Sequence, residues 1–138
     1  YREFDISREI ERLLAMVRDY QEATYMQGKD IPENIRFLQN YLEKHFAEEM
    51  SLDDMAKFSG ISKYHLCRSF KKYVGFAPGE YVIHLRLIQA MMLLESTSFP
   101  GYRIGQLVGF KNEANFINHF KKENKMTPGE YRRRMQVQ

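Results

Sequence analysis

The chain is 138 residues long, 43% hydrophobic and 28% charged, which suffices for one packed domain or two small ones and excludes a disordered polymer. A single cysteine excludes a disulfide scaffold, and no apolar run approaches the roughly 18 residues of a membrane span, so we expect a cytoplasmic protein without membrane contacts. The net charge is −6 over residues 1–54, +4 over 55–98 and +5 over 99–138. A basic rear part is typical of proteins that bind a polyanion.

Residues 5–25 are expected to form an amphipathic helix. Its apolar stripe has heptad-like spacing and consists of Ile6, Ile10, Leu13, Val17, Tyr20 and Thr24. The stripe is shorter than the three to four heptads of a sustained coiled coil, which favours a surface helix or a signalling linker over a dimer zipper. Because the chain starts at Tyr1 rather than Met, we expect residues 1–29 to end a regulatory domain whose front is missing.

Helix signals follow one another through the rest of the chain. Asp30 is predicted to cap the first helix, with Pro32 in its first turn; Ser51 and Ser62 are predicted to cap the next two. Breaks at glycine or proline then separate four more helical segments, near 79–95, 102–108, 112–123 and from 128 onward. No segment shows sustained strand alternation, so the predicted fold class is all-α.

An internal repeat has a period of 50 residues. Tyr64–Tyr81 and Ala114–Tyr131 share seven of 18 positions, where ordinary composition would give about one by chance. The identities are Phe-Lys-Lys at 70–72 and 120–122, and Pro-Gly-Glu-Tyr at 78–81 and 128–131. Such a repeat indicates a duplicated supersecondary unit.

The spacing of Ala56, Gly60 and Leu66 predicts a helix-turn-helix. The alanine permits close helix crossing, the glycine takes the tight turn, and the leucine packs the second helix on the first. In this motif the second helix enters the DNA major groove. The helix from 79 to 95 would be roughly 26 Å long, at about 1.5 Å per residue, and could hold two such units about one DNA turn apart.

Leu66 and Phe70 are expected to face inward on the first recognition helix, which leaves a basic outer face. Arg68 is the expected base reader, through guanine O6 and N7, unless it forms a surface ion pair instead. Tyr64 could pack on a thymine methyl group, and lysines suit phosphate contacts. The predicted DNA-binding positions of this helix are Lys63, Tyr64, Cys67, Arg68, Lys71 and Lys72.

The second unit has no arginine in the corresponding helix, so its base discrimination is expected to be weaker. Asparagine can read adenine, and glutamate can accept from cytosine N4, although exposed asparagines can equally be solvated filler. The predicted positions are Asn112, Glu113, Asn115, Asn118, His119, Lys121 and Lys122. Arg86, on the connecting helix, is a further candidate phosphate contact or an ordinary surface arginine.

These motifs, in this order, resemble the DNA-binding domain of AraC/XylS-type transcription regulators over about residues 32–135. The matching segments are Ser51–Ala56, Gly60–Ser62, Leu66–Lys72, Val108–Phe110, Phe116, Phe120–Lys122 and Pro128–Arg132. The resemblance implies seven helices in two helix-turn-helix units, 30–77 and 98–138, joined by a linker helix at 78–97. It also implies base contacts from both recognition helices, with Ala114 in the second by position, and activation of bacterial promoters with RNA polymerase as a partner. A homodimer through the missing front domain or residues 5–25 stays open.

Three positions depart from the family pattern. The family usually has alanine where Gly105 stands and an aliphatic residue where Gly101 stands, and both glycines cost helix stability. Lys125 stands where glycine commonly ends the recognition helix. We therefore expect the second unit to be the less rigid one.

Other classes of function have weaker support. The four histidines lack metal-ligand spacing, and no phosphate loop or nucleophile motif occurs, so we expect no enzyme activity, no metal and no cofactor. Cys67 lies among basic residues, which leaves a redox sensor conceivable. A helical protein-interaction adaptor would not explain the acid-free basic stretch 55–79, and RNA has a major groove too narrow for a helix.

Overall fold

The computed structural model describes residues 12–18 and 30–136, and these residues contain helices and connecting loops but no strand. Residues 12–18 are helical, inside the predicted helix 5–25, whose other residues lie outside the described part. Seven helices follow: α2 (Glu33–His45), α3 (Leu52–Ser59), α4 (Lys63–Val74), α5 (Pro78–Ser96), α6 (Gly101–Val108), α7 (Glu113–Asn124) and α8 (Pro128–Gln136). The all-α prediction is confirmed. Within the described ranges, no helix combines the length and apolar character needed to cross a bilayer.

Side-chain caps begin two of the helices where they were predicted. Ser51 and Asp54 form a reciprocal capping box: the Asp54 amide donates to Ser51 Oγ at 3.0 Å and the Ser51 amide to Asp54 Oδ2 at 3.1 Å. Ser62 Oγ accepts from the His65 amide at 3.2 Å. The predicted cap at Asp30 is wrong, because α2 starts only after Pro32, its N-cap, and Asp30 lies too far upstream to reach the free amides of the first turn.

Left-handed residues end α4 and α7, the second helix of each predicted helix-turn-helix. Gly75 ends α4 with a φ of 98°, and Lys125 ends α7 with a φ of 62°. Of the described residues other than glycine, Lys125 is the one with a positive φ. Left-handed backbone costs an L-residue about 1–2 kcal/mol, so α7 ends less favourably than α4.

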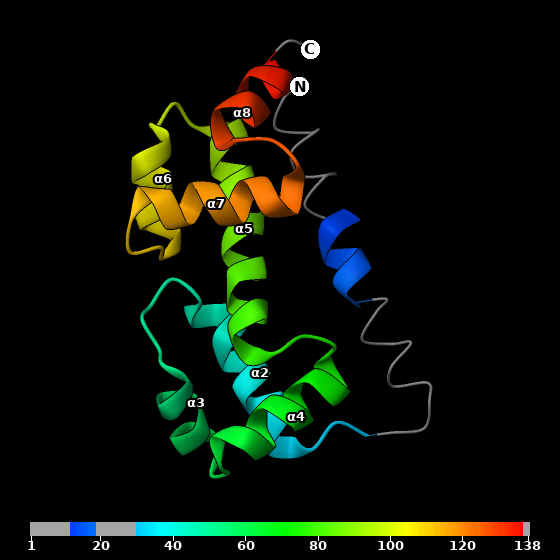
Figure 1. The fold of residues 1–138 in the computed structure, drawn as a ribbon. Coiled ribbons are helices and arrows are strands. Elements are labelled where there is room, and N and C mark those ends of the chain that lie inside the picture. Colours follow the sequence, from blue (N-terminus) through cyan, green and yellow to red (C-terminus); the bar gives the residue numbers. More distant parts are fainter. Residues whose placement is uncertain (1–11, 19–29, 137–138) are drawn as a thin grey trace.

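The described residues form two separate hydrophobic cores, one on each half of α5. Figure 1 shows α2, α3 and α4 around one half of α5 and α6, α7 and α8 around the other. The first core is built by α2, α3, α4 and the start of α5, and its fully buried members include Leu38, Leu66, Phe70 and Tyr81. The second is built by the rest of α5 with α6, α7 and α8. The long helix α5 therefore contributes side chains to both cores.

The duplicated units fill their helix crossings with different pairs of residues. Where the first unit has Ala56 and Leu66, the second has Gly105 and Phe116, all of them buried. A Cβ atom at Gly105 would lie 2.9 Å from Phe116 Cδ2 and 3.0 Å from its Cγ. The missing methyl group of Gly105 thus makes room for the larger phenylalanine, which gives this departure from the family pattern a packing reason.

Candidate nucleic-acid interface

The outer face of α4 is a continuous polar and basic surface. Leu66 and Phe70 are fully buried and anchor the helix, as their four-residue spacing predicted. The opposite side lines a shallow surface depression formed by Ser62, Tyr64, His65, Arg68, Ser69 and Lys72. His65 and Ser69 were missed by the sequence interpretation, although their helical spacing from Arg68 and Ser62 places them on the same face.

Arg68 and Tyr64 form one surface feature of this face. Arg68 Nη1 donates to the Tyr64 hydroxyl at 3.2 Å, and the Arg68 guanidinium carbon lies 5.6 Å from the centre of the Tyr64 ring. Both side chains are exposed, and Tyr64 is 72% exposed despite its size. A large exposed aromatic ring holding a guanidinium at the surface is suited to contact a flat, hydrogen-bonding ligand edge.

Other predicted positions of α4 differ in how freely they face solvent. Lys71 and Lys72 are exposed near the C-terminal end of the helix. Lys63 Nζ lies 3.1 Å from Asp53 Oδ1 of α3, so a phosphate would have to compete with this carboxylate. Cys67 is a free thiol and half-buried, which places it at the edge of the face rather than at its centre.

The helix α7 repeats this arrangement in the second unit. Phe116 and Phe120 are fully buried, at the positions equivalent to Leu66 and Phe70. Asn118 is exposed, as is Arg68 fifty residues earlier. The other exposed members of the predicted set are Glu113, Ala114, Asn115, Lys121 and Lys122.

Two predicted positions on α7 have structural roles. Asn112 is the N-cap of the helix, and its Oδ1 accepts from the Asn115 amide at 2.8 Å, so its side chain is engaged as that of Ser62 is in the first unit. His119 is half-buried, and its ring stacks on Phe110 at a centroid distance of 5.8 Å. His119 therefore packs against the protein, whereas Asn112 stays exposed, and a DNA contact by either residue remains a prediction.

Arg86 lies on α5 but does not extend into solvent as predicted. Its Nε donates to the Phe46 carbonyl at 2.7 Å and its Nη2 to the Glu48 carbonyl at 3.2 Å. Half burial of the guanidinium lowers its pKa from the ordinary arginine value, although arginine stays charged in proteins. Arg86 is thus held by contacts within the protein, which the sequence could not show because the partners are some 40 residues away. A phosphate contact by this half-exposed guanidinium stays a prediction.

The described residues contain no group of three His, Cys, Asp or Glu side chains placed to hold a metal ion. The site consists of the exposed faces of α4 and α7. Each helix carries a pair of lysines in its last turn, Lys71 and Lys72 in α4 and Lys121 and Lys122 in α7. Such faces can offer hydrogen bonds and positive charge to an extended anionic ligand.

Comparisons with known proteins agree on one family. A family described as a helix-turn-helix domain matches residues 55–134. The chain is 38% identical over 99 residues to the transcriptional regulator Rob of Salmonella typhimurium, covering 72% of this chain and 34% of that protein. It spans about a third of the length of the curated relatives it matches.

Solved structures show the same architecture. The C-terminal domain of AraT, a response regulator from Geobacillus stearothermophilus, superposes with a TM-score of 0.71 at 29% identity, covering 76% of this chain and 88% of that one. The DNA-binding domain of AdpA, a global transcriptional factor solved with a target DNA, superposes with a TM-score of 0.73 over 77% of this chain and 96% of that one. At 22% identity, this second likeness shows the fold alone.

Proposed function

Because the chain belongs to the AraC-type helix-turn-helix family, we propose that it is the double-stranded DNA-binding part of a bacterial transcription regulator and reads two base sequences with α4 and α7. The observation that carries this proposal is the duplication of one exposed helix face on two separately packed units. A single duplex presents successive major grooves on one side, and a tandem reader matches that geometry.

The side chains divide into base readers and phosphate contacts. In the first unit, Arg68 would bind guanine O6 and N7, while Tyr64 and the edge residue Cys67 would contact neighbouring base edges. In the second, Asn115 and Asn118 would read adenine, with Glu113 and Ala114 beside them. The phosphate contacts would come from Lys63, Lys71, Lys72, Lys121 and Lys122.

The proposal also covers the setting in which this domain acts. The protein would work in the cytoplasm, where bacterial DNA lies, and would activate transcription in contact with RNA polymerase. Support for activation comes from one relative at 29% identity, the lactose operon transcription activator of Staphylococcus xylosus. A sensing or dimerising domain in front of residue 30 would control it, since the chain spans only about a third of its relatives. It would itself catalyse no reaction.

Selection of duplexes from a random library tests the proposal. We expect enrichment of two short motifs about 10 base pairs apart, one for each recognition helix. Arg68→Ala should remove the base preference at one position of the first motif, and Asn118→Ala should do the same in the second motif. Selection that yields no sequence above bulk DNA would refute the proposed function.

A further inference from the structure

The orientation of the two units depends on few contacts. Every described pair of helices with an extensive contact either lies within one unit or includes α5. The first unit's helices α2, α3 and α4 therefore do not pack broadly against α6, α7 and α8. Packing of each core on α5 sets the distance between the units and their approximate rotation, and contacts between the units restrain the rotation that this packing leaves.

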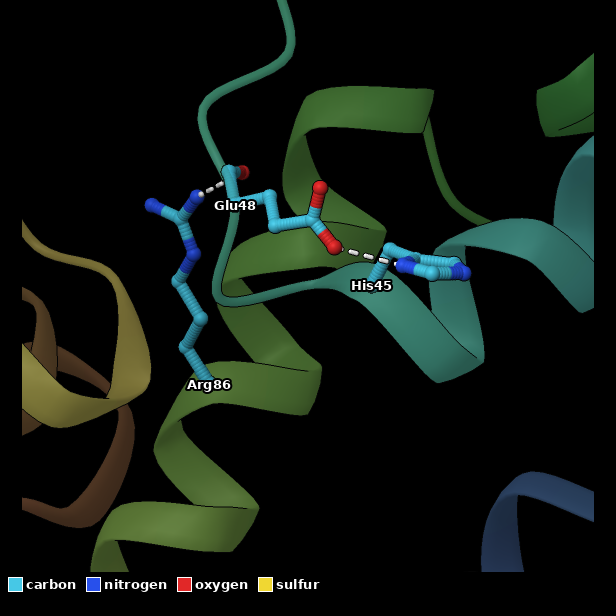
Figure 2. A network of polar contacts seen from close by, with 3 residues as sticks. All are labelled: His45, Glu48 and Arg86. Carbon is cyan, nitrogen blue, oxygen red and sulfur yellow. Dashed lines mark hydrogen bonds and ion pairs between the residues drawn. The ribbon is translucent and has the colours of Figure 1, made fainter.

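Arg86 makes such lateral contacts in both directions. Its guanidinium binds the carbonyls of Phe46 and Glu48, at the C-terminal end of α2 in the first unit, as Figure 2 shows for Glu48. Its guanidinium carbon also lies 5.7 Å from the ring centre of Phe110, a core residue of the second unit. One side chain in the middle of α5 thus touches both units.

The backbones of the two units meet beside Arg86. Gly109, which ends α6 with a φ of 113°, lies so close to the first unit that a Cβ atom there would be 2.7 Å from the Ala47 carbonyl oxygen. The same Cβ would be 2.8 Å from Arg86 Nε. At the exposed rim, Lys111 Nζ pairs with Glu49 Oε1 at 3.0 Å. Residues 46–49 are therefore held between Arg86 and the turn after α6.

Arg132 offers an internal comparison. Its Nε donates to the Leu94 carbonyl at 3.0 Å and its Nη2 to the Thr97 carbonyl at 3.1 Å, so it binds the C-terminal end of α5 as Arg86 binds that of α2. Both arginines thus compensate the partial negative charge of a helix end. The bonds of Arg132, however, stay within the second unit.

From this geometry we propose that Arg86 is a positioning residue that sets the rotation of one helix-turn-helix unit relative to the other, and thereby the spacing of base sequences the protein accepts. This inference rests on the proposed function and extends it to specificity. His84 is a second tie: its ring stacks on Phe76 at 5.2 Å and its Nδ1 lies 3.3 Å from Glu123 Oε1 of α7. Loss of Arg86 should therefore loosen the units without separating them.

The test compares Arg86→Met with Arg132→Met, since each removes one guanidinium from two carbonyls at a helix end. Affinity is measured for duplexes carrying both selected motifs at spacings around the wild-type optimum, about 10 base pairs. We expect Arg86→Met to lose on the order of ten-fold affinity at that optimum and little at neighbouring spacings, which flattens the profile. Arg132→Met should lower the melting temperature but keep the profile.

A DNA-free readout accompanies this test in case Arg86→Met folds poorly. Spin labels at Lys57→Cys on α3 and Tyr102→Cys on α6, in a Cys67→Ser background, report the distance between the units. The distribution should broaden in Arg86→Met and in the milder Arg86→Lys, which keeps the charge but loses the two-pronged geometry.

The outcomes separate the two hypotheses. An unchanged spacing profile and an unchanged label distance in folded Arg86 variants would overturn the positioning role, and so would equal flattening by Arg132→Met. A wild-type protein that binds no duplex above bulk would instead refute the proposed function, whatever the labels report.

Discussion

Arg68 and Lys72 lie on the same exposed face of α4, but their side chains differ in chemistry, so we expect different roles for them. Arg68 carries a planar donor fork beside Tyr64, and Lys72 carries a point charge one helical turn further along. Both are exposed and each contributes one positive charge. A comparison of the two therefore separates base reading from charge attraction.

Arg68→Ala should relax base preference at one position, at a cost of about 1–3 kcal/mol for the preferred base. Lys72→Ala should weaken all sequences alike and lower the salt slope by about one. Fluorescence titrations against single-base variants of the selected site measure both effects. Lys44→Ala, on α2 outside both recognition helices, is the control, and uniform weakening by Arg68→Ala would make Arg68 a phosphate contact.

Gly105 is expected to be needed where Gly101 is not. A Cβ at Gly105 would push on the near end of the fully buried Phe116 ring, whereas a Cβ at Gly101 meets nothing within 4 Å. Overpacking costs about 1–3 kcal/mol, against a helix-propensity gain of about 1 kcal/mol. Gly105→Ala should therefore lower the melting temperature, and Gly101→Ala should leave it unchanged or raise it.

Rescue makes this prediction specific. Adding Phe116→Leu to Gly105→Ala recreates the first unit's pairing of Ala56 with Leu66, so calorimetry should show recovery of part of the loss. If Gly105→Ala alone is as stable as Gly101→Ala, Phe116 moves aside without cost and the packing argument is wrong.

At the scale of helices, carboxylate caps link stability to pH. Hydrogen bonds from the backbone and hydroxyl of Ser51 hold the pKa of Asp54 below its ordinary 3.8, and those of Thr127 hold the pKa of Glu130 below its ordinary 4.5. A carboxyl group whose pKa is lower in the folded than in the unfolded state stabilises the fold at every pH above its unfolded-state pKa. This stabilisation is lost as the pH falls through the folded-state pKa.

We therefore expect the melting temperature to fall as the pH drops below about 4.5, and this dependence to be weaker in a variant with Asp54→Asn and Glu130→Gln. Thermal unfolding followed by circular dichroism between neutral and acidic pH measures it. Glu33→Gln, at the start of the uncapped helix α2, is the matched control and should keep the wild-type profile. If the melting temperature depends on pH identically in all three proteins, the two carboxylate caps are not the cause of the acid destabilisation.

At the scale of the whole molecule, the exposed lysines of two recognition helices should act on one duplex. If Lys63, Lys71, Lys72, Lys121 and Lys122 each neutralise a phosphate, the logarithm of affinity should fall with the logarithm of salt concentration with a slope of about −4 to −5. Titrations at several salt concentrations measure this slope. A protein-interaction adaptor would not bind DNA in this salt-dependent way. A slope of about −2 to −3 would mean that only one unit contacts the duplex.

The amino-acid sequence by itself determined the helices, their breaks, the duplication and the inward residues Leu66, Phe70, Phe116 and Phe120. These follow from local rules of periodicity and capping that act over a few residues. Only the tertiary structure decided that Arg86 binds carbonyls rather than solvent, that His119 stacks on Phe110, and that Gly105 accommodates Phe116. Each of these depends on how helices or turns meet in space, and helical periodicity carries no information about which partner a side chain meets there.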